Sequence, residues 1–340
     1  MLEIFACVPA AIPAPASIWR RLASPALIGL MLGISANQAF CENLVVAVAR
    51  QPLSLPFYVA EAEGHFAAEG LQLRIEDCNF GRACLEKLLS KQVVIATVAD
   101  IPIVLSGLAG HPVSLLATIS EAENYSKLLV RKSSGIGAPR DLVGKRIGTV
   151  SGTGAHYLLD TFLIFNGIER RDATVVELLP EAAVAAIAKG EIDALVIFEP
   201  YAFTAVQMLG KDAQVLATKR ISHTTFNVVI DRRIAGPRDA ELGKMLRALD
   251  RANRFIRDQP VKAQAILRKR LQFDQNFVDW VWKDMEFRLS LEQSLISSLE
   301  SQSRWAVRAG FATAVTPNYL NYVHAAPLAS VLPAAVSILK

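Results

Sequence analysis

The chain has 340 residues, which at about 150 residues per domain favours two domains and excludes a miniprotein held by disulfides. Hydrophobic residues make up 52% and charged residues 20%, so the composition provides a large core and argues against long disorder. There are 36 Lys and Arg against 32 Asp and Glu, and the resulting net charge of +4 is too dilute for a nucleic-acid-binding surface.

The first forty residues have the pattern of an export signal. Two arginines precede the apolar run 25–36, which ends in small residues before a polar pair. The run is shorter than the roughly 20 apolar residues that a transmembrane helix needs. We therefore expect a signal peptide over residues 1–39, cleaved near its end, and an exported protein that is soluble after cleavage.

The four cysteines are interpreted in that exported context. Cys7 lies within the expected signal peptide, and Phe40 stands where a lipoprotein signal would place a small residue, which argues against a lipid anchor on Cys41. Only five residues separate Cys78 from Cys84, so in an oxidising compartment they could form a local disulfide. Two buried thiols fit the spacing equally well, because spacing alone does not fix the Cα separation that a disulfide requires.

Short β-rich runs alternate with amphipathic segments of helical length through the first two thirds of the chain. This rhythm predicts an α/β fold in which helices cover a sheet. We expect strands at 44–50, 71–75, 93–99, 114–119, 127–132, 146–150, 174–178 and 194–198, and helices near 57–69, 82–91, 154–166 and 181–189.

The last third of the chain has a different pattern, since apolar residues recur with the helical period from about residue 238 and Pro260 is placed to begin a helix. Two extended segments, 120–127 and 222–230, have the character of crossings between lobes. A chain that leaves one lobe, completes a second and returns encloses a cleft with two hinges. The sequence therefore predicts two lobes.

A possible anion site lies in the segment 146–159, where a strand, a Ser/Gly/Thr turn and a helix follow one another. Such a turn presents backbone N–H groups at a helix N-terminus, where the helix dipole favours an anion. Ser151 and Thr153 could instead serve as ordinary helix caps, and His156 either donates to an anion or packs on the first helical turn.

Three further polar residues stand at the ends of predicted elements. Gly81 and Arg82 begin a helix, which places a guanidinium beside free amides; an exposed, solvated arginine is the alternative. Asp100 and Glu199 each end a β-rich run, at the edge where open α/β sheets bind ligands. Both acids precede helical segments, so helix capping is an equally good explanation.

Catalytic and metal-binding patterns are missing from the sequence. It contains no GxSxG, HExxH or CxxC, and its five histidines are scattered. We therefore expect neither an enzyme nor a bound metal or cofactor.

Several stretches together resemble periplasmic substrate-binding proteins of ABC importers for nitrate, aliphatic sulfonates and taurine, a family that also includes binders of thiamine-pyrimidine precursors. The segments that carry the resemblance are 55–75, 84–104, 141–168 and 189–201, and the similarity continues into 291–310 and 318–331. It implies a two-lobed periplasmic-binding-protein fold of type II, with lobe I at 43–122 plus 227–340 and lobe II at 123–226.

The resemblance also implies a function and a set of cleft residues. The protein would be a periplasmic monomer that captures a small anion and delivers it to a membrane permease with its ATPase. The matching positions are Gln51, Phe57, Arg82, Asp100, Ser120, Ser151, Thr153, His156 and Glu199, with Gly81 beside Arg82.

The identity of the ligand stays open between several small molecules. An acid at Glu199 would repel nitrate but pair with an ammonium group, which favours an amino-sulfonate such as taurine. In that hypothesis Glu199→Gln weakens the binding of aminated ligands alone. The alternatives are a binder of a thiamine-type pyrimidine, an enzyme on the same fold and a receptor that senses without transport.

Overall fold

A computed structural model describes residues 44–218, 221 and 223–338. The expected signal peptide, Cys7 and Cys41 lie outside the described residues. Among the described helices, none combines the length and the apolar character needed to cross a bilayer.

The first sheet has six strands in the order β11-β4-β10-β3-β1-β2. Strands β1, β2 and β3 run parallel, whereas β10 is antiparallel to both β3 and β4. Strand β1 reads LVVAVA and is almost entirely buried, as expected for a parallel strand covered on both faces. The bounds are β1 Leu44–Ala49, β2 Leu73–Cys78, β3 Ile95–Ala99, β4 Val113–Glu123, β10 His223–Asp231 and β11 Met285–Glu286.

The second sheet has five strands in the order β7-β6-β8-β5-β9. Strand β6 is parallel to β7 and β8, and β5 is antiparallel to β8 and β9. The bounds are β5 Ser126–Arg131, β6 Arg146–Thr149, β7 Thr174–Glu177, β8 Ala194–Phe198 and β9 Ala213–Leu216.

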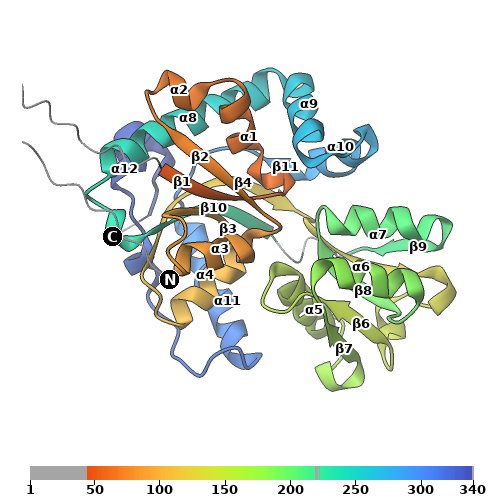
Figure 1. The fold of residues 1–340 in the computed structure, drawn as a ribbon. Coiled ribbons are helices and arrows are strands. Elements are labelled where there is room, and N and C mark those ends of the chain that lie inside the picture. Colours follow the sequence, from red (N-terminus) through yellow and green to blue (C-terminus); the bar gives the residue numbers. More distant parts are fainter. Residues whose placement is uncertain (1–43, 219–220, 222, 339–340) are drawn as a thin grey trace, which may run out of the picture. The chain divides into compact units, whose positions relative to one another are not determined.

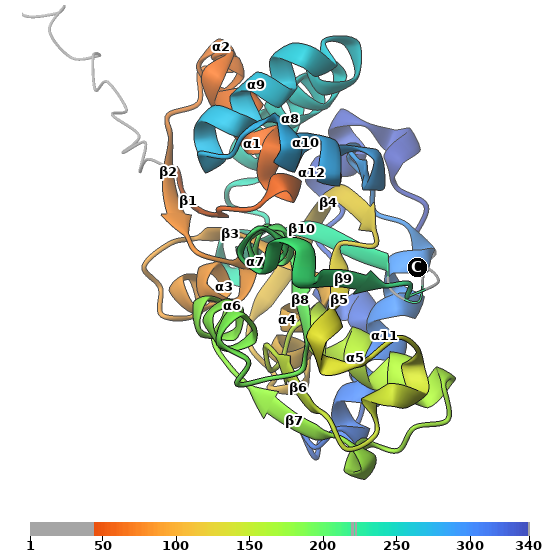
Figure 2. The ribbon, with the colours of Figure 1, turned by 90° about the vertical axis from the view of Figure 1, so that its right-hand side faces the viewer.

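Helices cover both faces of each sheet (Figure 1). On the first sheet, α1, α2, α8 and α9 lie on one face, and α3, α4 and α11 lie on the other. On the second sheet, α6 and α7 pack together on one face and α5 covers the opposite face, as Figure 2 shows from the side. The bounds are α1 Leu55–Ala62, α2 His65–Ala68, α3 Gly81–Leu89, α4 Asp100–Leu108, α5 Gly154–Phe165, α6 Pro180–Lys189, α7 Tyr201–Leu209, α8 Asp239–Asp258, α9 Pro260–Leu271, α10 Gln275–Val281, α11 Gln293–Arg308 and α12 Ala326–Val331.

The chain passes between the sheets twice, and the first passage lies where a crossing was expected. Strand β4 ends at Glu123 and β5 begins at Ser126, with Asn124 at a positive φ of 55° between them. The return passes from β9 to β10, and the expected second crossing at 222–230 was misplaced, because that segment is almost entirely strand β10 of the first sheet. The α/β class with two sheets joined by two crossing segments is confirmed, and the division at 43–122 plus 227–340 and 123–226 remains a proposal.

The secondary structure follows the predicted pattern with one notable break. The helix expected over 57–69 is divided into α1 and α2 at Gly64, which has a φ of +68°. Such a conformation suits glycine and ends a helix. The remaining predicted strands and helices of the first two thirds are present, displaced by a few residues at their ends.

Candidate functional site

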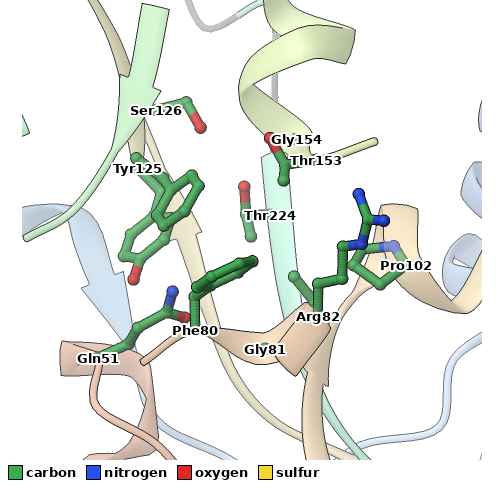
Figure 3. A pocket seen from close by; sticks show the side chains of 12 residues that line it. Gln51, Phe80, Gly81, Arg82, Pro102, Tyr125, Ser126, Thr153, Gly154 and Thr224 are labelled. Atoms are coloured by element: carbon green, nitrogen blue, oxygen red, sulfur yellow. The ribbon is translucent and has the colours of Figure 1, made fainter. Parts of the chain in front are cut away.

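A small cavity lies where α3 and α5 begin beside the two crossing segments (Figure 3). It leaves about 30 Å³ for the centres of water-sized molecules, and one water needs about 10–15 Å³ on that measure. The space therefore suits a group as small as a three-oxygen headgroup. Its walls are formed by Gln51, Phe80, Gly81, Arg82, Ala99, Pro102, Tyr125, Ser126, Thr153, Gly154, Phe198 and Thr224.

Two helix N-termini open onto this cavity without a side-chain cap. Phe80 stands at the N-cap of α3, and Thr153 at the N-cap of α5 uses its hydroxyl to donate to the Val150 carbonyl at 2.7 Å. The first N–H groups of both helices therefore lack a capping acceptor. Two helix dipoles and their unsatisfied amides favour an anion in the space between them.

Gly81 lets the start of α3 approach β3 closely. A Cβ atom at this position would lie 3.2 Å from the Ala99 nitrogen and 3.3 Å from the Val98 Cα. Both neighbours are backbone atoms, so neither can move aside easily. The glycine thus places the N-terminus of α3 against the end of β3.

Three buried polar side chains line the cavity without a hydrogen-bond partner among the described residues. They are Gln51, Ser126 and Thr224, with exposed fractions of 3%, 2% and 6%. Their polar atoms are open to the cavity rather than sealed within protein, so they remain available to a ligand. Their convergence on one cavity is the pattern of a site prepared for a polar ligand.

Arg82 supplies the one formal positive charge among the lining residues. Its Nη1 donates to the Ser151 carbonyl at 3.2 Å, and its Nε donates to the Glu86 carboxylate at 3.2 Å. The side chain is about half exposed, so this ion pair with Glu86 is weak. A guanidinium held this loosely can turn toward an anionic ligand.

Aromatic rings form much of the remaining wall. Phe80 and Phe198 lie with ring centroids 6.1 Å apart, and the Tyr125 hydroxyl donates to the Glu199 carbonyl at 2.9 Å. Figure 3 places Gln51, Phe80 and Tyr125 at one side and Arg82 with Pro102 at the opposite side. No Asp or Glu is among the described lining residues, so nothing in this wall repels an anion.

Four of the residues expected in the cleft line this cavity: Gln51, Gly81, Arg82 and Thr153. Two others are structural. Phe57 is fully buried in α1 and packs on Phe66 at 6.0 Å between ring centroids. Ser120 is also fully buried and donates its hydroxyl to the Leu53 carbonyl at 2.6 Å.

Asp100 does not line the cavity either. It is 3% exposed, and its carboxylate accepts from the Ile101 amide at 2.8 Å and from the Gln302 side chain at 2.8 Å. Burial raises the pKa of the Asp100 carboxyl, and the two hydrogen bonds oppose that rise. The carboxylate thus joins the start of α4 to α11.

Glu199 belongs to a buried charged cluster with Lys127, Trp280 and Asp284. Its carboxylate accepts from the Trp280 indole N–H and from the Phe203 amide, and the Lys127 ammonium lies 3.5 Å away. Lys127 also lies 3.8 Å from Asp284 and donates to the Asn124 carbonyl at 2.6 Å. Burial raises the pKa of the Glu199 carboxyl, and the ammonium opposes this.

Ser151 and His156 line a neighbouring cavity beside α5 and the end of α11. The His156 ring meets Trp305 and Phe311 edge-on, at 5.7 Å and 5.2 Å between centroids. Burial lowers the pKa of this imidazole, although Asp160 opposes the shift. His156 thus packs against aromatic rings outside the cavity, and its Nδ1 has no hydrogen-bond partner among the described residues.

Sequence reasoning missed Phe80, Tyr125, Ser126, Phe198 and Thr224 among the lining residues. Their signals were nevertheless present. Ser126 and Thr224 lie in the two segments predicted to cross between lobes, and Phe198 precedes the expected Glu199. Neighbouring residues of a strand point to opposite faces, so Phe198 can line the cavity while Glu199 turns away from it.

Cys78 and Cys84 form a disulfide in the structure, with their Cα atoms 5.6 Å apart. It joins the end of β2 to the second turn of α3. Of the two arrangements that the spacing allowed, the structure has the disulfide. The bond fixes the helix whose N-terminus borders the cavity.

This chain is similar to known proteins in both sequence and fold. Residues 51–263 match the family described as NMT1/THI5 like. The taurine-binding periplasmic protein of Escherichia coli (strain K12) is 32% identical over 186 residues, which cover 54% of this chain and 56% of that protein. The 4-amino-5-hydroxymethyl-2-methylpyrimidine phosphate synthase of Uromyces fabae is 30% identical over 144 residues, covering 42% of this chain and 41% of that enzyme. The chain thus spans about half the length of these curated relatives.

A solved structure covers more of the fold. The alkanesulfonate-binding protein SsuA from Xanthomonas axonopodis pv. citri, bound to MOPS, superposes with a TM-score of 0.73 at 19% identity, over 83% of this chain and 97% of that one. The expected periplasmic-binding-protein fold is confirmed by this likeness. The expected resemblance to taurine-binding proteins is confirmed by the sequence of the Escherichia coli relative.

Proposed function

Because this chain belongs to the NMT1/THI5-like family, we propose that it is an exported solute-binding protein that captures an organic sulfonate and delivers it to a membrane permease with its ATPase. The observation that carries the proposal is the convergence of two uncapped helix N-termini on one cavity. Three unpartnered buried polar side chains face the same space. The names of the taurine-binding and alkanesulfonate-binding relatives support the same ligand class.

The energetics favour a negatively charged headgroup. Hydrogen bonds to a charged group contribute about 1.5–3 kcal/mol each, and micromolar affinity needs about 8 kcal/mol in total. The free amides of α3 and α5, together with Gln51, Ser126 and Thr224, offer more donors than that sum requires. The anion needs no complete countercharge, since the helix dipoles and Arg82 add favourable electrostatics.

Binding is better supported than catalysis. The described lining residues include hydroxyl groups, but no His, Cys, Lys, Asp or Glu that could serve as a base beside them. The similarity to the synthase from Uromyces fabae, which covers 42% of this chain, makes an enzyme the second candidate function. A thiamine-type pyrimidine therefore belongs among the ligands tested.

The structure gives no support to an ammonium partner at Glu199, because its carboxylate already accepts from Trp280 and Phe203. We expect Glu199→Gln to change the affinities for taurine and for ethanesulfonate by the same factor. A selective loss of taurine binding, measured by calorimetry, would restore the ammonium hypothesis.

The primary test removes one amide from the start of α5. Proline is tolerated at the first position of a helix, and Thr153 has the extended conformation that a following proline requires, with φ −127° and ψ 171°. Gly154→Pro should therefore preserve α5 while deleting an N–H donor. We expect sulfonate affinity to fall by about tenfold or more, from the loss of one charge-assisted hydrogen bond.

The control makes the same change at a helix start outside the cavity. Gln275→Pro alters the first residue of α10, and it should leave sulfonate affinity unchanged. Binding is measured by calorimetry and thermal shift with taurine, ethanesulfonate, nitrate, bicarbonate and a thiamine-type pyrimidine. A response to the pyrimidine without any response to the sulfonates would overturn the proposal.

A further inference from the structure

Trp305 packs against the start of α5 from a helix that covers the first sheet. It lies in α11, which packs on α4, and the residue is 4% exposed. Its ring meets His156 and Tyr157 edge-on, with ring centroids 5.7 Å and 5.2 Å away. These are the third and fourth residues of α5, and Gly154, the first residue, lines the cavity. The indole ring therefore contacts the helical turn that borders the cavity.

A hydrogen bond adds to this packing. The Trp305 indole N–H donates to the Asp160 carboxylate at 3.0 Å. Asp160 lies on α5 four residues after His156, and its side chain is 13% exposed. A hydrogen bond to a charged acceptor is stronger than a neutral one, and shielding from water strengthens it further. Trp305 thus holds α5 through both its ring and its N–H.

A second link between the first sheet's helices and the start of α5 is weaker. Arg82 of α3 donates to the carbonyl of Ser151, just before α5, at 3.2 Å. Its side chain is 47% exposed, and interactions of exposed charged side chains contribute little. Of the two links, the one through Trp305 is the more deeply buried, so it should fix the position of α5 more firmly.

The position of α5 matters because the proposed site binds its ligand through backbone amides. An N–H group has a fixed direction, and a hydrogen bond weakens steeply as its angle closes. The amides of α3 stand on the first sheet and those of α5 on the second, so the two sets must be held at the correct separation. Groups that are already in place lose less freedom when the ligand binds.

We propose that Trp305 is a positioning residue of the ligand site, which holds the start of α5 at the cavity without touching the ligand. Trp305 is not among the residues that line the cavity. This inference rests on the proposed function, since it takes a sulfonate as bound between the starts of α3 and α5. Loss of the link should lower the affinity for different sulfonates by the same factor, because it moves shared amides.

The first experiment replaces the indole by a ring without a donor. Calorimetry measures taurine and ethanesulfonate binding to the unaltered protein and to Trp305→Phe, at a temperature at which both are folded. We expect both affinities to fall by about fivefold, from the loss of one hydrogen bond. Unchanged affinities overturn the positioning role and leave the proposed function intact. If the unaltered protein binds neither sulfonate, both proposals are overturned.

The control is Tyr319→Phe, which also removes a buried donor from an aromatic residue. The Tyr319 hydroxyl donates to the Val104 carbonyl at 3.0 Å, and Tyr319 does not line the cavity. This variant should lose stability as well, yet its sulfonate affinities should stay within twofold of those of the unaltered protein. An equal loss of affinity in both variants would show that binding follows general stability, which overturns the positioning role.

The second experiment tests the route from Trp305 to α5. Asp160→Asn keeps the size of the acceptor and removes its charge, so sulfonate affinity should fall by about two- to threefold. In a background of Trp305→Phe the same substitution should cause no further loss, because the bond that it weakens is already absent. Losses that multiply in the double variant, or an Asp160→Asn variant that binds as tightly as the unaltered protein, contradict the proposal.

Discussion

The cavity and the charged cluster around Glu199 are both built from buried polar groups, yet they differ in how those groups are satisfied. In the cluster, Glu199 accepts from Trp280 and Phe203, and Lys127 lies beside two carboxylates. In the cavity, Gln51, Ser126 and Thr224 have no protein partner among the described residues. The cluster's polar groups are satisfied by protein and stabilise the fold, whereas those of the cavity are left open to a ligand.

The largest expected effect comes from removing the cation of the cluster. Lys127→Met leaves the buried Glu199 without its countercharge, which should lower the free energy of unfolding by about 3 to 5 kcal/mol. Urea denaturation measures the change. Lys189→Met, at a side chain that is 68% exposed, should alter stability by less than about 0.5 kcal/mol. An equal, small effect of both substitutions would show that the cluster does not stabilise the fold.

The second-largest loss of stability is expected from removing the disulfide, which holds the helix α3 beside the cavity. Replacing Cys78 and Cys84 together by alanine removes the constraint on a short loop and should lower the free energy of unfolding by about 2 kcal/mol. A reductant should produce a similar loss in the unaltered protein and little further loss in the double variant. Thiol titration of the denatured protein before and after reduction tests the bond directly, and its failure to release two additional thiols would contradict the pairing.

A matched pair of serines tests the contrast most directly. Ser120→Ala removes a hydroxyl that donates to the Leu53 carbonyl, so it should cost about 1 kcal/mol of stability. Ser126→Ala removes an unpartnered hydroxyl, so stability should change by less than about 0.5 kcal/mol while ligand affinity falls by about fivefold. Urea denaturation measures the stability of each variant, and calorimetry measures its affinity for the ligand. A reversed pattern would place the ligand contact at Ser120.

The smallest effect is expected at the partly exposed pair of His223 and Glu121, whose Nε2 and carboxylate oxygen lie 2.9 Å apart. The hydrogen bond to Glu121 raises the pKa of His223 above 6.5, and the same bond lowers the pKa of Glu121 below 4.5. The pair therefore stabilises the fold fully between about pH 4.5 and 6.5. This contribution is lost as pH rises through the raised pKa of His223, or falls through the lowered pKa of Glu121.

The experiment compares unfolding of the unaltered protein with that of His223→Gln at pH 6 and pH 8.5. Because the His223 side chain is 49% exposed, the stability difference at pH 6 should stay below about 1 kcal/mol and should shrink at pH 8.5. A difference that grows with pH would show that the pair acts through some other interaction.

Local sequence patterns were sufficient for the parts of the site that follow directly from secondary structure. Gly81, Arg82 and Thr153 could be found because helix starts have recognisable sequences. The first crossing could be found because an extended segment interrupts the α/β rhythm, whereas the second was confused with strand β10. The sequence could not show whether Asp100 and Glu199 bind a ligand or cap a helix, because an acid between a strand and a helix fits both roles. Their hydrogen bonds to Gln302 and Trp280 come from residues 202 and 81 positions away.

The sequence by itself determined the class of the fold, most strands and helices of the first two thirds, and the first passage between the sheets, because hydrophobic periodicity and turn residues are local properties. Tertiary structure decided which polar groups are left without partners. Phe57 and Ser120 turn into the core, whereas Ser126 and Thr224 face the cavity, and a shift of one residue along a strand is enough to exchange those roles. Satisfaction of a polar group depends on residues distant in the chain, and therefore becomes visible only when the packed elements are seen together.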